Sequence, residues 1–407
     1  MTGRRNDGRS GAPETLTGHE ANAGRSGPPA ECPVSATSAS NLPPQGVHRA
    51  VLLDGTSTWI VSRYDDVRGF LADERFSRGI ASAKRGPGGP ALRMSITEMD
   101  RPLHARIRRL VAAGFSTSSV QRIRPFIERT ATSLLDDMIA TGPPSDLLRS
   151  YAAPLTFASQ CEVLGVPVAR RATARHWSTA RSGRPGTAPE AICAAEFELH
   201  ACVVTIIAEL RRTPGTGLLD RLIVAHDRDG LLDEAELHGV GASLFFDGHF
   251  LVATQIANAV LDLLASPEQL RDLRTGYVPI GRAVEELIRF NPAINHSMTR
   301  IATCDLEIDG VAIRAGELVT ASLPATNRDA TVFDDPAALS FDRPSNNRHL
   351  AWGHGIHFCL GIHLARAELQ VALTSLLSRF PALQVAGTPE SFTTTSARGV
   401  LALPVTW

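Results

Sequence analysis

The sequence predicts a mainly α-helical protein with a small β portion and one core. Apolar residues recur at helical spacing over four long segments, namely 103–115, 120–140, 150–164 and 189–211. A fifth segment, about 233–265, would form a helix of roughly 48 Å at 1.5 Å per residue. Segments with the pattern of strands are few and short by comparison.

The first part of the chain has the composition of a disordered tail. Residues 1–45 are rich in Gly, Pro and Ser, and the first aromatic residue is Trp59. Such a stretch cannot bury enough apolar surface to offset its ordering entropy. We therefore expect a tail over 1–45 and a single domain over 46–407.

Turn and capping signals define the start of the folded part. Residues 51–53 and 59–61 are apolar and flank Asp-Gly-Thr-Ser, which predicts a hairpin. Asp65 then precedes a helical pattern and is expected to cap that helix. Residues 79–93 are rich in Gly, Pro and Arg and are expected to form a long loop.

The remaining elements follow from apolar periodicity and length. The centre of the 233–265 segment is apolar on nearly all sides, so this helix should cross the interior. Further along the chain we expect strands over 306–308, 311–313 and 318–320, a helix over 362–379 and a last strand over 400–403.

Charge and apolar content exclude several kinds of partner. Lys plus Arg is 41 and Asp plus Glu is 42, so there is no basic excess for nucleic acid. We see no signal-peptide pattern and no uninterrupted apolar run of the ~18 residues that a membrane span needs. We expect a soluble, cytoplasmic protein.

One cysteine has unusual neighbours. The six cysteines form no C-x-x-C pair, which argues against a zinc ribbon or a thioredoxin-type motif. Cys359, however, lies among Gly353, Gly355 and Gly361, directly before the predicted helix. Glycine lets the backbone approach a flat ligand closely, and a helix N-terminus stabilises a thiolate. The pattern suits an anionic cysteine under a metal.

The segment 352–361, W-G-H-G-I-H-F-C-L-G, resembles the heme-binding loop F-G-x-G-x-H-x-C-x-G of the cytochrome P450 superfamily. It departs only at Trp352, where Phe is usual. The resemblance implies the cytochrome P450 fold, with heme b (iron protoporphyrin IX) between the long central helix and the helix after the loop. It implies Cys359 as the iron ligand and Gly353, Phe358 and Gly361 as cofactor-binding residues.

Other motifs extend the resemblance over about 46–407. Glu286 and Arg289 match the E-x-x-R motif, and Arg343 resembles the third member of its buried ion network. His104 and Arg108 match an H-x-x-x-R helix that binds heme propionates in the family.

Two further residues, Arg300 and His349, stand where additional propionate partners usually lie in the family. An arginine fork suits a carboxylate, so the chemistry agrees with the resemblance.

The central helix departs from the family pattern A-G-x-[D/E]-T. The matching stretch runs Asp247, Gly248, His249, Phe250, Leu251, and we take these five as the candidate catalytic segment. Phe250 replaces the acid and Leu251 the threonine, which in the family relay protons during dioxygen cleavage. Asp247 lies one turn before Leu251 on the same face, while for His249 packing is an equally good interpretation.

This departure suggests atypical chemistry on a small natural product. The resemblance implies that members without the acid–threonine pair often perform atypical chemistry, including coupling of aromatic natural products. We therefore expect oxidative C–C or C–N coupling of an aromatic substrate such as a cyclic dipeptide. One alternative is a regioselective hydroxylase with a substitute proton path through Asp247. The other is a non-catalytic heme-binding protein.

The general layout of the family implies where substrate and redox partner bind. We expect substrate contacts from Phe246, Ile294, Asn295, Ser297, Phe392 and Thr394. The polar members could anchor amide groups or simply face solvent. No flavin or iron–sulfur segment is left in 46–407, so a separate ferredoxin and ferredoxin reductase should supply electrons, docking near Arg109 and Arg366.

Overall fold

The computed structural model describes residues 42–84, 95–182, 187–344 and 346–407. Contacts group residues 33–407 into one compact unit. The predicted tail over 1–45 therefore lies largely outside the described residues. Its last two residues belong to the fold, because Ser62 Oγ donates to the Pro44 carbonyl at 2.9 Å and Gln45 Nε2 donates to the Ala325 carbonyl at 3.2 Å.

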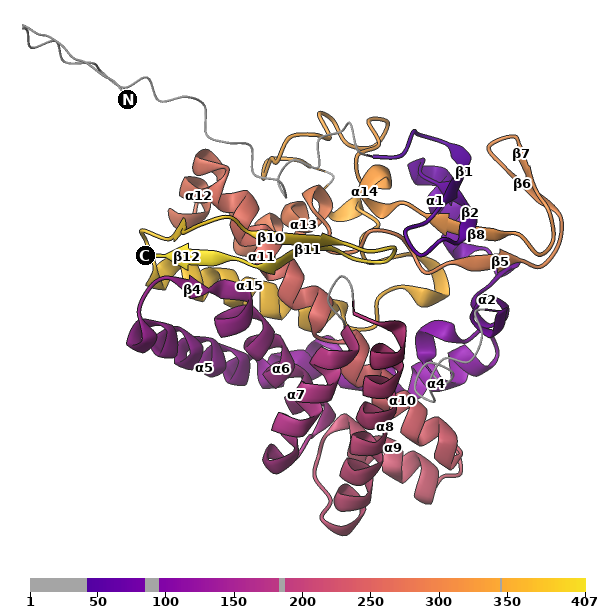
Figure 1. The fold of residues 1–407 in the computed structure, drawn as a ribbon, viewed down its shortest axis with the longest axis horizontal. Helices are drawn as coiled ribbons and strands as arrows, with labels where there is room; N and C mark the ends of the chain where they lie inside the picture. Colours follow the sequence, from indigo (N-terminus) through magenta and orange to yellow (C-terminus); the bar gives the residue numbers. More distant parts are fainter. Residues whose placement is uncertain (1–41, 85–94, 183–186, 345) are drawn as a thin grey trace, which may run out of the picture. The chain divides into compact units, whose positions relative to one another are not determined.

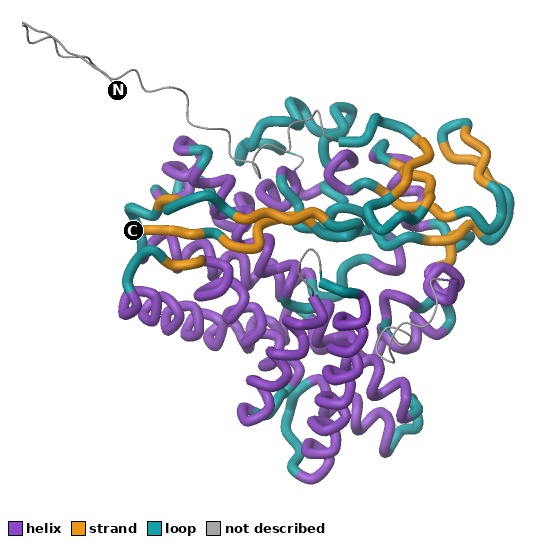
Figure 2. The backbone as a smooth tube through the Cα atoms, viewed as in Figure 1, coloured by secondary structure: helices purple, strands orange, loops and turns teal. Residues whose placement is uncertain are grey.

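Helices make up most of the described chain, as predicted (Figures 1 and 2). The α-helices are α1 Tyr64–Ala72, α2 Arg78–Lys84, α4 Leu103–Ala112, α5 Thr117–Thr141, α6 Ala153–Leu164, α7 Val168–Ser182, α8 Pro189–Arg212, α9 Leu218–Asp227, α10 Glu234–Asp247, α11 Phe250–Leu264, α12 Pro267–Arg274, α13 Ile280–Phe290, α14 Leu323–Thr326 and α15 Ile362–Arg379. Short 3₁₀ turns are η2 Ile96–Glu98, η3 Ala113–Phe115, η5 Asn346–Arg348 and η6 Gly355–His357, and η4 Leu148–Ala152 is a π-helical turn before α6.

The strands form small sheets. They are β1 Val47–Val51, β2 Ser57–Val61, β3 Phe76–Ser77, β4 Ser145–Asp146, β5 Arg300–Ala302, β6 Leu306–Ile308, β7 Val311–Ile313, β8 Leu318–Ala321, β9 Gln384–Val385, β10 Glu390–Thr393, β11 Arg398–Ala402 and β12 Pro404–Thr406. The largest sheet has the order β1-β2-β8-β5-β3, in which only β2 and β8 pair in parallel. The others are β10-β11, β4-β12-β9 and β6-β7.

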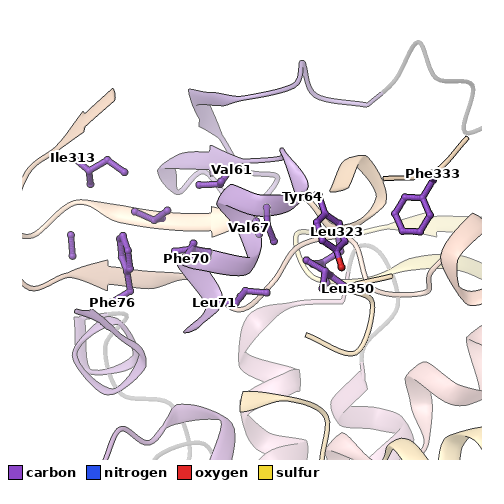
Figure 3. Packing of buried hydrophobic residues seen from close by; sticks show 13 residues of the cluster. Val61, Tyr64, Val67, Phe70, Leu71, Phe76, Ile313, Leu323, Phe333 and Leu350 are labelled. Carbon is purple, nitrogen blue, oxygen red and sulfur yellow. The ribbon is translucent and has the colours of Figure 1, made fainter. Parts of the chain in front are cut away.

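The predicted hairpin near the N-terminus is confirmed, with Val47 paired to Val61. Its sheet packs against α1 through a buried apolar cluster that includes Val61, Phe70 and Val319 (Figure 3). This cluster joins the first strands of the chain to β8, about 260 residues later. The N-terminal elements are therefore fixed by the C-terminal half of the chain.

Two sequence-based details of this region are wrong. Helix α1 begins at Tyr64, its N-cap is Arg63, and Asp65 lies in its first turn. The Tyr64 N–H is instead satisfied by Asp329 Oδ2 at 2.8 Å, a distant carboxylate that periodicity cannot identify. The predicted loop over 79–93 is helical up to Lys84, and residues 85–94 lie outside the described part.

The predicted central helix is divided in two. α10 ends at Asp247, α11 begins at Phe250, and Gly248 and His249 lie between them. Gln160 of α6 donates from Nε2 to the Leu244 carbonyl at 2.6 Å. That carbonyl would otherwise accept the N–H of Gly248 in a continuous helix. A side chain from another helix thus accounts for a break that apolar periodicity did not reveal.

Two helices are apolar and long enough to cross a membrane, namely α8 and the stretch Glu234–Leu264. Both are interrupted by charged residues, such as Glu196 and Asp247, so neither is the uninterrupted apolar run of ~18 residues that the sequence analysis did not find. In the second, 67% of the apolar window is buried inside the fold, which is also the pattern of a core helix. The absence of a membrane partner stays a prediction.

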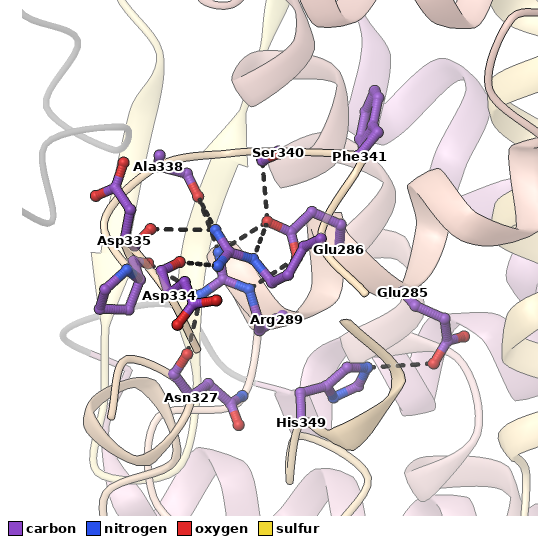
Figure 4. Close-up of polar contacts among 12 residues, drawn as sticks. Glu285, Glu286, Arg289, Asn327, Asp334, Asp335, Ala338, Ser340, Phe341 and His349 are labelled. Carbon is purple, nitrogen blue, oxygen red and sulfur yellow. Dashed lines mark hydrogen bonds and ion pairs between the residues drawn. The ribbon is translucent and has the colours of Figure 1, made fainter. Parts of the chain in front are cut away.

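A buried ion network fixes the chain ahead of the Cys359 loop (Figure 4). Arg289 donates twice to Glu286 at 2.8 Å on α13, and Arg343 Nε reaches Glu286 Oε1 at 3.1 Å. Arg289 also donates to the carbonyls of Asn327 and Ala338 at 2.9 Å. The network therefore fastens the irregular segment 327–343 to α13, as the E-x-x-R resemblance implied.

Removing the carboxylate should destabilise the fold strongly. In Glu286→Gln, two buried guanidinium groups lose their counter-charge, so we expect a loss of about 3–5 kcal/mol in the free energy of unfolding, measured with urea. Arg379→Ala, which breaks an exposed pair with Asp136, is the control and should cost about 1 kcal/mol or less. Equal losses in the two variants would contradict a structural role for the network.

Candidate functional site

The Cys359 loop is shaped by backbone geometry. Gly353 and Gly355 have φ of +73° and +72°, a region that favours glycine. A Cβ on Gly355 would lie 2.5 Å from the carbonyl oxygen of Leu71 on α1, so no larger residue fits there. The Cys359 N–H donates to the Trp352 carbonyl at 2.9 Å and closes the loop directly before α15.

The surroundings of Cys359 exert opposing effects on its thiol. Burial raises the pKa to about 11, while the N–H of Gly361 and the charges of Arg108 and Arg366 lower it. The negative charge of Asp247 also raises the pKa, although Asp247 comes from α10. The thiol thus has partners that stabilise its anion, and the last residue of α10 is close enough to act on it.

Basic side chains gather beside this loop. Arg108 of α4 donates from Nη2 to the Phe358 carbonyl at 2.6 Å. The ring of His104, also on α4, lies edge-on to His357 with 4.5 Å between centroids. Burial and the neighbouring charges lower the pKa of His104 to about 4 and that of His357 to about 2, so both rings are neutral at pH 7. His357 Nε2 is buried and has no hydrogen-bond partner among the described residues.

Arg300 is a buried cation without a carboxylate in the described residues. It is 4% exposed, donates to the Phe70 carbonyl at 3.3 Å and lies over the Phe70 ring at 5.3 Å. Burial and the charge of Arg78 lower its pKa to about 10. A buried guanidinium with only a carbonyl partner suits an acidic ligand, because buried charges are normally paired.

The contacts of His349 argue against the role that the resemblance implied. Its Nε2 lies 3.2 Å from Glu285, and its Nδ1 accepts the Ala351 N–H at 3.3 Å. Glu285 also accepts two bonds from Arg366, at 2.7 and 2.8 Å. Both ring nitrogens of His349 are thus occupied within the protein, as Figure 4 shows for Glu285. His357, which the pattern H-x-C contains but which we did not single out, has a buried ring nitrogen without a partner among the described residues.

The side chains of the central helix point to different neighbours. Phe250 meets Phe392 of β10 with 5.9 Å between ring centroids. This contact brings together two residues that were predicted for different roles. Asp247 is exposed and accepts a weak hydrogen bond from Ser95 Oγ at 3.4 Å. Leu251 is half-buried on the same helix as Phe250. This face is therefore mostly apolar, with one carboxylate at the end of α10.

His249 is a packing residue and not part of that face. Its Nε2 lies 2.6 Å from Ser178 Oγ on α7, and its ring stands edge-on to Phe157 of α6 at 5.3 Å. Burial and the charge of Arg175 lower its pKa to about 4. Of the two interpretations that the sequence left open, the contacts support packing, so His249 leaves the candidate catalytic set.

The polar residues predicted to touch substrate are engaged elsewhere. Asn295 Nδ2 donates to the Thr394 carbonyl at 3.1 Å, and Thr394 Oγ1 donates to Ala397 across its own turn. Ser297 Oγ accepts the Ala321 N–H at 2.9 Å. These groups fasten the β10–β11 hairpin and β8 to the segment after α13. Phe392 and Ile294 place apolar side chains beside the β10–β11 hairpin. Phe246, the last predicted substrate contact, is half-buried on α10.

The neutral state of His249 should make stability depend on pH. The unfolded chain takes up a proton near pH 6.5 that the folded protein takes up only near pH 4. Stability is thus unaffected by this group above pH 6.5 and falls as the pH drops toward 4. His249→Gln should reduce the loss of unfolding free energy between pH 7 and 5 by about 2 kcal/mol, measured by urea titration at each pH. Parallel profiles of parent and variant would contradict this.

Comparisons with known proteins agree with this geometry. The family model "Cytochrome P450" matches residues 280–405. The chain is 40% identical over 366 residues to nocardicin C N-oxygenase from Nocardia uniformis subsp. tsuyamanensis, covering 87% of this chain and 90% of that protein. It is 38% identical over 360 residues to mycinamicin IV hydroxylase/epoxidase from Micromonospora griseorubida, covering 87% and 90%.

Comparison with a solved structure also points to the cytochrome P450 fold. The fold matches a crystal structure of a cytochrome P450 with biaryl coupling reactivity at a TM-score of 0.80 and 36% identity, covering 89% of this chain and 93% of the other. A mainly helical fold with small sheets is thus confirmed. Sequence and structure together show that this chain belongs to the cytochrome P450 family of heme-dependent oxidative enzymes.

Proposed function

We propose that this chain binds heme b with Cys359 as the iron ligand. Supporting this are the glycine-shaped loop, the N–H of Gly361 and the two guanidinium groups that favour the anion of Cys359. Gly353, Phe358 and Gly361 would border the ring from the loop. These groups fit the cofactor, since they offer one sulfur whose anion has hydrogen-bond and charge partners, and a backbone that allows close approach.

His104, Arg108, Arg300 and His357 would hold the acidic edge of the cofactor. Arg300 has no carboxylate partner and His357 Nε2 has no partner at all among the described residues, so both have capacity to spare. Two acidic groups there would give the buried charge of Arg300 a counter-charge and give His357 Nε2 a hydrogen-bond partner. His357 replaces His349 in this proposed set.

When bound, heme supplies the capacity to activate dioxygen with electrons from a partner. What this chain adds is an apolar wall, since Phe250 stands in place of the usual acid and packs against Phe392, and Leu251 stands in place of the usual threonine. Aromatic edges orient an aromatic substrate and exclude water. Asp247 is the carboxylate that α10 places at the end of this wall.

The substrate we propose is an aromatic small molecule of the natural-product class, such as a cyclic dipeptide, and the reaction is oxidative C–C or C–N coupling. One bond forms between two rings, and each ring loses one hydrogen. The substrate thereby gives up two electrons and two protons. Dioxygen takes these together with two electrons and two protons from outside, and leaves as two waters. The observation that supports this is the contact of Phe250, which replaces the acid, with Phe392 of β10, beside Leu251, which replaces the threonine.

The relatives support a tailoring role and leave two reaction types. Two are named as an N-oxygenase and a hydroxylase/epoxidase, and one solved structure has biaryl coupling reactivity. A regioselective hydroxylase is therefore our second candidate, favoured by the exposed carboxylate of Asp247 beside the buried Ser95. Both named relatives are enzymes, which argues against a non-catalytic heme-binding protein.

We propose a separate ferredoxin and ferredoxin reductase as the electron source, and a cytoplasmic location. Arg109 is exposed on α4, one residue after Arg108, which contacts the Cys359 loop. Arg366 is held by Glu285 and lies over the Trp352 ring at 5.8 Å, so its charge is partly neutralised. Arg109 is thus the better of the two predicted docking residues.

Cys359→Ala should abolish the red-shifted Soret band that reduced, thiolate-ligated heme gives with carbon monoxide. The physical reason is that the variant has no anionic sulfur at the loop. Cys161→Ala, at a buried cysteine of α6, is the matched control and should keep the band. Retention of the band in Cys359→Ala would refute the ligand assignment.

Product mass separates the two candidate reactions. Coupling predicts a joined product that has lost two hydrogens, whereas hydroxylation predicts the gain of one oxygen. Asp247→Asn should lower turnover by about tenfold or more if its carboxylate handles protons, and should leave turnover nearly unchanged if the substrate provides its own. A sole product carrying one extra oxygen would exclude coupling. Mass spectrometry with a panel of aromatic cyclic dipeptides provides both measurements.

A further inference from the structure

The break in the central helix is held by a residue from another helix. Gln160 is fully buried on α6, and its Nε2 donates to the Leu244 carbonyl at 2.6 Å. The carbonyl can only accept, so the amide nitrogen must face it and Oε1 must face away. Leu244 is four residues before Gly248, which makes its carbonyl the regular helical acceptor for the Gly248 N–H.

The amide of Gln160 lies directly against Gly248. A Cβ on Gly248 would be 2.3 Å from both the amide carbon and Oε1 of Gln160, so no larger residue fits at this position. Within the described residues, Gly248 caps α10 without a backbone bond from its own N–H. The regular ladder resumes only with the Ala253 N–H, which donates to the His249 carbonyl at 3.0 Å. The Gln160 amide therefore stands in the gap between α10 and α11.

The oxygen of the same amide is unsatisfied. Gln160 Oε1 is buried and has no hydrogen-bond partner among the described residues. Buried polar atoms in folded proteins are nearly always paired, with protein or with ordered water. A water bound between Oε1 and the released Gly248 N–H would have one acceptor and one donor, the minimum that an internal water needs.

We propose that Gln160 is the positioning residue that keeps the central helix open, and that its free oxygen binds a water molecule at the break. Leu251 has no hydroxyl with which to compete for a helix carbonyl, so a group from outside the helix performs that task. The site lies between Asp247 and Phe250, next to His249, whose ring is held by Ser178. The proposal holds whether the product is coupled or hydroxylated.

Hydrogen exchange at Gly248 tests the first half in the heme-loaded, full-length protein. In Gln160→Ala the Leu244 carbonyl is free, so the Gly248 N–H should bond to it and exchange about tenfold more slowly than in the parent. A mutation that merely loosens packing would accelerate exchange. Thr156→Ala, at a buried residue one turn earlier on α6, is the matched control and should not slow it. Unchanged or faster exchange at Gly248 in Gln160→Ala would overturn the proposal.

Melting temperatures of a second set of variants test the contact between Gln160 and Gly248 without hydrogen exchange. Gly248→Ala alone should lower the melting temperature, because its methyl group would collide with the Gln160 amide. In the double variant Gln160→Ala/Gly248→Ala, that loss should largely disappear. Additive losses in the double variant would overturn the proposed contact.

The water itself is tested by a crystal structure of the parent at a resolution that shows solvent. A water within hydrogen-bond distance of Gln160 Oε1 and the Gly248 nitrogen is the expected result. A dry contact, or a direct protein partner for Oε1, would overturn the second half of the proposal.

Discussion

The buried carboxylate of Glu286 is the interaction on which the rest of this structure depends. It holds Arg289 and Arg343 at the same time, and through Arg289 it fastens the carbonyls of an irregular segment to α13. That segment leads directly into the Cys359 loop, which has little regular structure of its own. This buried ion network is structural, and it fixes the position of the segment that precedes the Cys359 loop. Without it, the glycines of the loop would have no fixed frame in which to adopt their left-handed conformations.

Much of the fold and part of the site follow from the sequence, because they depend on local pattern. Several elements can be predicted from patterns within about 25 residues of chain. They are the β1–β2 hairpin, the helices α5, α8 and α15, and the Cys359 loop. The Cys359 loop was the most informative segment for the candidate site, because its glycines, its cysteine and the helix that follows all point to the same kind of ligand. Helix α7, by contrast, is rich in Arg and Ala and contains few large apolar residues, so we did not identify it.

The parts that sequence could not predict are those decided by distant side chains. Asp329 satisfies the first N–H of α1, and Gln160 divides the central helix. His349 was predicted to bind a propionate and pairs with Glu285, whereas His357, which was not predicted, has a buried nitrogen without a partner among the described residues. Asn295 was predicted to contact substrate and donates to a hairpin turn. In each case the deciding partner is remote in sequence, so local pattern could not identify it.

The close contact between Gly355 and Leu71 has a consequence for assembly. The tightest turn of the cysteine loop rests on the backbone of α1, almost 300 residues earlier, so neither can reach its final position alone. Bringing together residues so far apart in sequence carries an entropic cost, which slows folding. The contact also requires a chain synthesised at least as far as Gly355, so a shorter nascent chain cannot fix the Cys359 loop in place.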